Sequence, residues 1–107
     1  MPALQTSSSL AALADPTRQR IVAMLAGGAL SSGEIAGKFD LSAPAISQHL
    51  KTLKAAHLVS VRNDKQKRIY SLDPKGVQEV SEWVAHIQAF WNPRLDALEA
   101  ALKKDAK

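Results

Sequence analysis

The chain has 107 residues, enough for one compact domain, and 46% of them are hydrophobic, which supplies a core and excludes a wholly disordered chain. It has no cysteine, which excludes disulfides, thiolate metal sites and cysteine nucleophiles. The net charge of +4 favours a polyanionic partner such as nucleic acid, and no apolar run approaches the roughly 20 residues that span a membrane.

The N-terminal part of the chain is predicted to form two helices. Met1 to Ser9 contain no basic residue and no long apolar region, so no secretory signal is recognised and a cytoplasmic protein is expected. Leu4 to Leu13 is predicted to be a short helix. Asp15-Pro16 indicates a second start, because Asp caps a helix and Pro suits its first position, and this helix runs to about Leu25.

Two further helices are predicted on either side of a short turn. The Ser-x-x-Glu spacing of residues 31–34 is that of a capping box and predicts a short helix to Lys38 or Phe39. Ser42 is then expected to cap a longer helix through about Ala56. Two helices joined by so short a turn are typical of a helix-turn-helix.

A β-hairpin and a long helix follow. Val59–Arg62 and Arg68–Leu72 alternate apolar and polar residues around the polar segment 63–67, which predicts a hairpin with a basic tip. Asp73-Pro74 starts a helix that reaches about residue 102, and at Asn92-Pro93 it either kinks or gives way to a new segment capped by Asn92. The expected fold is therefore mainly α with a small β-hairpin, a winged helix-turn-helix that occupies residues 1–107 as a single domain.

The helix over residues 42–56 is the candidate for contact with double-stranded DNA. Ile46, Leu50 and Leu53 share a face that must be buried, and the opposite face is small and polar, then basic, which suits the major groove. Gln48 can make a bidentate contact to adenine, and lysines further along suit phosphates. The predicted DNA-contacting residues are Ser42, Ala43, Pro44, Ser47, Gln48, His49 and Lys51. For His49 two partners stay open, a phosphate or a backbone carbonyl. The alternative for the whole segment is an ordinary amphipathic surface helix.

The hairpin carries a cluster of basic residues, Arg62, Lys65, Lys67 and Arg68. As a wing it would reach the sugar-phosphate backbone or the adjacent minor groove. The alternative is a solvated turn, but a cluster of four favours contact.

The C-terminal helix is too apolar for the surface of a monomer, which predicts a homodimer. The residues predicted at its interface, from the terminal helices at about 4–13 and 74–102, are Leu4, Leu10, Val80, Val84, Ile87, Trp91, Leu95 and Leu98. A two-fold dimer would place two recognition helices about one turn of DNA apart on a palindromic site. The alternative is that this whole stripe is internal core.

These residues resemble the ArsR-type winged-helix regulators. The likeness runs from about Leu10 to Pro74 and lies in the segments 13–21, 47–59 and 68–74, which read LADPTRQRI, SQHLKTLKAAHLV and RIYSLDP. The resemblance implies a homodimeric repressor whose terminal helices form the dimer interface and which ligand or metal binding releases from its operator. At the usual glycine of the Ala-Gly-Leu turn this chain has His57, which can adopt a left-handed conformation at some cost.

The resemblance leaves the effector unknown. Thiolate sensors of the family carry cysteines on the first helix of the helix-turn-helix, where this chain has none. Other members bind zinc between paired C-terminal helices through an Asp-x-His and a later His. Here Glu82 and His86 are four residues apart and could face one metal, but no Asp-x-His precedes them, so a solvated Glu-His pair is favoured and neither a metal nor another cofactor is expected.

The sequence leaves two alternative functions open. A metal-responsive repressor using Glu82 and His86 and a winged-helix module that binds protein are the alternatives. An enzyme is not expected, because no serine or histidine lies in a nucleophile elbow or at a recognisable catalytic spacing.

Overall fold

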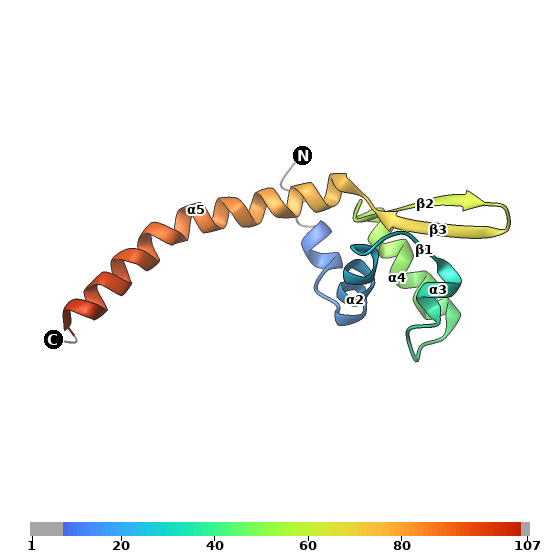
Figure 1. Ribbon diagram of the computed structural model, residues 1–107, viewed down its shortest axis with the longest axis horizontal. Coiled ribbons are helices and arrows are strands. Elements are labelled where there is room, and N and C mark those ends of the chain that lie inside the picture. Colours follow the sequence, from blue (N-terminus) through green and yellow to red (C-terminus); the bar gives the residue numbers. More distant parts are fainter. Residues whose placement is uncertain (1–7, 106–107) are drawn as a thin grey trace.

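A computed structural model describes residues 8–105 as a small helical domain from which one long helix projects (Figure 1). In chain order the elements are a helical turn over 8–12, α2 (Pro16–Leu25), β1 (Leu30–Ser31), α3 (Ser32–Ala36), α4 (Ala43–Ala55), β2 (Val59–Asp64), β3 (Lys67–Leu72) and α5 (Pro74–Asp105). The predicted winged helix-turn-helix is confirmed. The first part of the predicted helix 4–13, with Leu4, lies outside the described residues.

The predicted starts of α2 and α3 are present. Asp15 Oδ2 accepts the N–H of Arg18 at 3.0 Å, and Pro16 follows the cap. At α3 the capping box is complete, since Ser31 Oγ accepts the N–H of Glu34 at 3.1 Å and Glu34 Oε1 accepts the N–H of Ser31 at 2.9 Å. The hydrogen bond from the Ser31 N–H is the main reason that the pKa of the Glu34 carboxyl lies below its usual value of 4.5.

α3 is shorter than predicted, because it ends at Ala36 and not at Lys38 or Phe39. The N–H groups of Lys38 and Phe39 bond to the carbonyls of Ile35 and Ala36, three residues earlier, at 3.0 and 3.2 Å. Such bonds tighten the last turn and end the α-helix. Phe39 packs against the core, and the Arg20 guanidinium lies 4.4 Å from the centre of its ring.

The sheet has three antiparallel strands in the order β1-β3-β2, whereas the sequence predicts only β2 and β3. β1 pairs with β3 through Leu30 opposite Tyr70 and Ser31 opposite Ile69. A strand of two residues has no alternating pattern that could reveal it. The extra pairing joins the middle of β3 to the start of α3.

The wing, defined here as residues 59–72, is more regular than predicted. The sequence assigns residues 63–67 to the turn, but the strands pair as far as Asp64 opposite Lys67, which leaves Lys65 and Gln66 as the tip. Lys65 has a φ of 60°, a left-handed conformation that a non-glycine residue adopts at some cost. The ladder therefore supports the wing almost to its end.

The core of the domain lies between α2, α3, α4 and the sheet. The predicted buried face of α4 is confirmed, since Ile46 and Leu50 are 2% exposed and Leu53 is 0% exposed. Ile21 from α2 and Ile35 from α3 are likewise buried. Each such side chain contributes about 1.5–3 kcal/mol on burial, so the core determines which side of α4 faces outward.

The turn between α4 and β2 anchors α5 to this domain. His57 has a φ of 59°, so the left-handed conformation expected there is confirmed. Its carbonyl accepts the N–H of Gly76 at 2.8 Å. A Cβ on Gly76 would lie 2.1 Å from the same oxygen, so only glycine permits this approach.

α5 is one continuous helix of 32 residues that passes through Pro93. Of the two outcomes expected there, a new segment capped by Asn92 is wrong, because Asn92 lies inside the helix, which curves along its length without a break (Figure 1). Proline removes one backbone donor and crowds the preceding turn. Beside it, Arg94 Nη1 donates to the carbonyl of Phe90 at 2.7 Å, and the guanidinium lies 3.8 Å from the centre of the Phe90 ring.

Candidate DNA-binding surface

The side of α4 opposite the core is open to solvent. Ser42 caps the helix, since its Oγ accepts the N–H of Ala45 at 3.2 Å. Six of the residues predicted to face DNA are exposed, namely Ser42, Ala43, Pro44, Ser47, Gln48 and Lys51. The structure thus leaves this polar side uncovered by the described part of the chain, and its contact with DNA stays a prediction.

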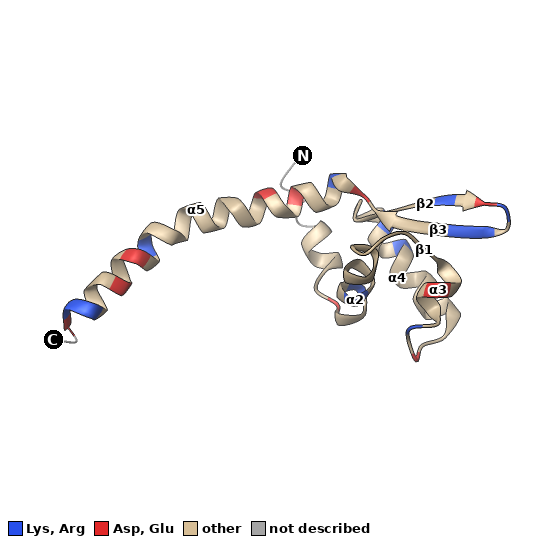
Figure 2. Cartoon of the chain, viewed as in Figure 1, with Lys and Arg blue, Asp and Glu red and all other residues tan. Residues whose placement is uncertain are grey.

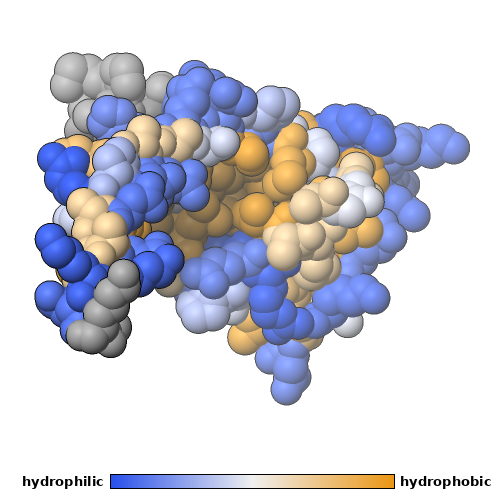
Figure 3. Space-filling model, turned by 60° about the vertical axis from the view of Figure 1, so that its left-hand side comes forward, coloured by the Kyte–Doolittle hydropathy of each residue, from blue (hydrophilic) through white to orange (hydrophobic). Residues whose placement is uncertain are grey.

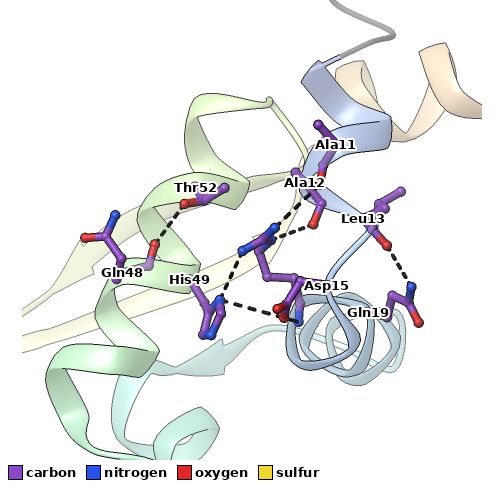
Figure 4. Close-up of polar contacts among 9 residues, drawn as sticks. Ala11, Ala12, Leu13, Asp15, Gln19, Gln48, His49 and Thr52 are labelled. Atoms are coloured by element: carbon purple, nitrogen blue, oxygen red, sulfur yellow. Dashed lines mark hydrogen bonds and ion pairs between the residues drawn. The ribbon is translucent and has the colours of Figure 1, made fainter.

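Two polar side chains on this side of α4, Gln48 and Thr52, differ in whether their polar groups are free to bind a partner. Thr52 Oγ1 donates to the carbonyl of Gln48 at 3.1 Å, so its hydroxyl is engaged within the helix (Figure 4). The Gln48 side chain is exposed and points away from α2 (Figure 4). A free amide offers one donor and one acceptor side by side, which is what a bidentate contact to adenine requires.

Cationic side chains of α4 and the wing converge between these two elements. A hollow of about 160 Å³ is lined by Ser47, Lys51 and Lys54 of α4 and by Arg68 and Tyr70 of β3, with Leu50 and Val61. Arg68 also lines a hollow of about 270 Å³ between α3, α4 and β3. This junction suits a phosphate group, because three positive side chains surround it.

The basic residues predicted for the wing lie along both of its strands and at its tip (Figure 2). Arg62, Lys65, Lys67 and Arg68 are all exposed. Arg62 Nη1 lies 4.0 Å from Asp64 Oδ2, and the two side chains are 67% and 56% exposed, so water weakens this pair. The wing therefore keeps a positive surface close to the polar side of α4.

His49 lies at the edge of this surface and contacts side chains, not the backbone carbonyl that the sequence left as one option. Its Nδ1 lies 3.3 Å from Arg18 Nη1 and 3.9 Å from Asp15 Oδ2 (Figure 4). The pKa of the Asp15 carboxyl is lowered, first by the backbone N–H of Arg18 and also by the charges of His49 and Arg18. The sequence does not predict Arg18 here, because it is 31 residues from His49 and no local spacing links them.

A second surface of interest is the apolar side of α5. Among the predicted interface residues, Val80 packs against the core and Leu10 and Ile87 are half-buried. The others are open, with Val84 41%, Trp91 48%, Leu95 54% and Leu98 56% exposed. The alternative that the whole stripe is internal core is therefore wrong for a single copy of residues 8–105.

Figure 3 looks toward the C-terminal side of the molecule and shows hydrophobic surface gathered in a hollow between hydrophilic margins. Exposed large hydrophobic residues continue along α5 to Leu102. Contiguous apolar surface of this kind marks an interaction site. Within residues 8–105 no helix is both long and apolar enough to cross a membrane.

The described residues contain no group of three His, Asp or Glu side chains that could hold a metal ion. Glu82, one of the two metal ligands considered, accepts a hydrogen bond from Gln78 Nε2 at 3.0 Å.

Comparison with known proteins gives matches over the same region. A family model described as a helix-turn-helix domain matches residues 13–62. The HTH-type transcriptional regulator Rv2034 of Mycobacterium tuberculosis is 45% identical over 84 residues, which are 78% of this chain and 76% of that protein. The transcriptional repressor SdpR of Bacillus subtilis is 40% identical over 73 residues, 68% of this chain and 81% of the repressor.

The fold comparison agrees with these matches. The crystal structure of an ArsR family transcriptional regulator superposes with a TM-score of 0.77 at 26% sequence identity. The superposition covers 84% of this chain and 93% of that one. Since α5 holds 32 of the 107 residues, a superposition of this extent reaches into α5.

Proposed function

This chain belongs to the ArsR family of winged helix-turn-helix, DNA-binding transcriptional regulators, and from that membership we propose that it is a homodimeric repressor of a palindromic operator. In this proposal α4 enters the major groove, and the wing contacts the backbone or the adjacent minor groove. Such a regulator acts where the DNA is, so we place it in the cytoplasm, and we assign it no catalytic activity.

The observation that carries the proposal is the division of α4 into two sides. One side is buried in the core through Ile46, Leu50 and Leu53, so the helix cannot rotate to hide the other. The other side presents Gln48 and Lys51 to solvent beside a basic wing. A fixed polar helix face with flanking cations supplies both base contacts and phosphate contacts.

The dimer is supported by the apolar side of α5. Its exposed residues include Val84, Trp91, Leu95, Leu98 and Leu102, at intervals of seven, four, three and four residues, as at the interface of two packed helices. Exposing this surface in a single copy is unfavourable by about 25 cal/mol per Å² of apolar area. A second copy provides a matching surface, because a two-fold interface uses the same patch on both partners.

The experiment begins with operator identification, in which purified protein captures genomic fragments that are then sequenced. Binding of the recovered site is measured by fluorescence anisotropy at several salt concentrations. We expect Gln48→Ala to relax the preference at one base position and Lys67→Ala to weaken binding equally for all sequences. Loss of one phosphate contact also reduces the salt slope by about 0.9.

Lys104→Ala is the matched control, because it removes the same charge at the far end of α5 (Figure 2). It should leave both affinity and salt slope unchanged. If no fragment is enriched, or if Gln48→Ala and Lys67→Ala bind as the parent chain does, the proposal fails. The chain would then be better described as a winged-helix module that binds protein.

A further inference from the structure

Arg18 connects three parts of the molecule that DNA recognition needs to keep in register. We propose that Arg18 is a positioning residue for DNA recognition, which holds α4 against the helical turn 8–12 and fixes the tautomer of His49. This inference rests on the proposed function, since it takes α4 as the helix that reads DNA.

The three guanidinium nitrogens of Arg18 each face a different acceptor. Nε donates to the carbonyl of Ala12 at 2.6 Å, and Nη2 to the carbonyl of Ala11 at 3.5 Å. Nη1 donates to Nδ1 of His49 on α4 at 3.3 Å (Figure 4). The planar, rigid arrangement of these donors transmits the position of one segment to the other.

The backbone of Arg18 is itself fixed at the start of α2. Its N–H donates to Asp15 Oδ2 at 3.0 Å, and the same oxygen lies 3.9 Å from His49 Nδ1. Since Asp15 caps α2, the whole group moves with that helix. Three elements, the helical turn 8–12, α2 and α4, thus meet at one cluster.

The contact also decides where His49 carries its proton. Arginine only donates, so whenever the His49 ring is neutral this contact requires Nδ1 to accept and leaves the ring proton on Nε2. The His49 side chain, which is 21% exposed at the edge of the DNA-facing side, then has its Nε2–H as a free donor within the described part of the chain. Phosphate oxygens are the acceptors that such a donor suits.

The position of the cluster gives it a role beyond packing. On α4, His49 lies between Gln48, which is exposed and is the proposed base reader, and Leu50, which is buried in the core. A shift of α4 at His49 would therefore move Gln48 relative to the core. The helical turn 8–12 contains Leu10, which we place at the dimer interface. Arg18 therefore links the element at the interface to the element that reads DNA.

The test compares Arg18→Gln with Gln19→Ala. Gln19 Nε2 donates to the carbonyl of Leu13 at 2.7 Å, so it contacts the residue directly after the helical turn 8–12. Among the side-chain hydrogen bonds of the described residues, Gln19 makes none to α4. We expect Arg18→Gln to weaken operator binding about tenfold with an unchanged salt slope, and Gln19→Ala to bind as the parent does. His49→Asn should show a similar loss, and the double variant Arg18→Gln/His49→Asn should be no weaker than either single one.

A second readout is nitrogen-15 NMR of the His49 ring. The parent chain and Gln19→Ala should show the Nε2–H tautomer, and Arg18→Gln a mixture of both. If Arg18→Gln does not fold, Arg18→Lys replaces it in both measurements, because lysine keeps the positive charge but offers one donor nitrogen in place of three.

Four results would overturn the inference. Parental affinity of Arg18→Gln on an operator that the parent binds refutes the positioning role alone. A salt slope reduced by about 0.9 would make Arg18 a direct phosphate ligand. An unchanged tautomer in Arg18→Gln would remove the link to His49. Absence of operator binding by the parent chain refutes the proposed function, and this inference with it.

Discussion

The contact between Gly76 and His57 permits a prediction whose sign depends on tertiary structure. Gly76 lies in the first turn of α5, where alanine would ordinarily stabilise the helix by about 1 kcal/mol. In the fold, however, a Cβ at this position would lie 2.1 Å from the His57 oxygen, 2.5 Å from its carbonyl carbon and 3.0 Å from the Ala56 oxygen. All three atoms belong to the backbone, so no side chain can rotate out of the way.

We therefore expect Gly76→Ala to destabilise the protein. Overpacking costs about 1–3 kcal/mol. Moving α5 away from the α4–β2 turn to relieve the clash also breaks the hydrogen bond from Gly76 to His57, which adds about 0.5–1.5 kcal/mol. After the gain in helix propensity the net loss is about 2 kcal/mol. For a chain of this size that corresponds to a decrease in Tm of about 8–16 °C.

The assay is thermal unfolding followed by far-ultraviolet circular dichroism at one protein concentration, since the Tm of a dimer depends on concentration. Gly33→Ala is the control, because Gly33 lies within α3 and its Cβ would meet only Ser31 Oγ at 3.9 Å. That change should raise the Tm or leave it unaltered. If Gly76→Ala raises the Tm as well, the close approach of α5 to the α4–β2 turn is refuted.

Further predictions concern backbone strain, assembly and pH. His57→Gly should stabilise the fold by about 0.5–1 kcal/mol in the same assay, because glycine adopts the observed φ of 59° without strain, and a lower Tm would contradict this. Val84→Glu should turn the dimer into a monomer in sedimentation velocity, whereas Ala85→Glu, exposed on the neighbouring side, should not, and a parent chain that sediments as a monomer would refute the dimer. Asp15 and Glu34 have lowered pKa values in the fold, so their contribution to stability is complete above their usual values of 3.8 and 4.5 and is lost as the pH falls through the folded values. Glu34→Gln should accordingly reduce the loss of Tm on acidification, and an identical acid profile would contradict the assignment.

Local signals in the sequence predicted most of the helices and the wing. A capping residue and its partner lie within three positions of one another, as Ser31 and Glu34 do, so a helix start can be read without knowledge of the fold. The same holds for the division of α4 into a buried and an open side, because the periodicity of Ile46, Leu50 and Leu53 follows from helix geometry alone.

The sequence motifs also predicted membership of the ArsR family, and the comparisons with known proteins confirmed it. The particular residues that touch DNA and the second copy stay predictions. For these residues the structure adds only their positions, with the six on α4 exposed and the apolar side of α5 left open at Val84 and beyond.

Only the tertiary structure decided the features that depend on segments far apart in the chain. The pairing of β1 with β3, the contact of Arg18 with His49 and the requirement for glycine at position 76 each arise where two such segments meet. None has a local pattern, because the partner that makes the residue necessary lies beyond the reach of helix or strand periodicity. Pro93 illustrates the same limit, since proline alone signals a break, whereas α5 continues through it as one helix.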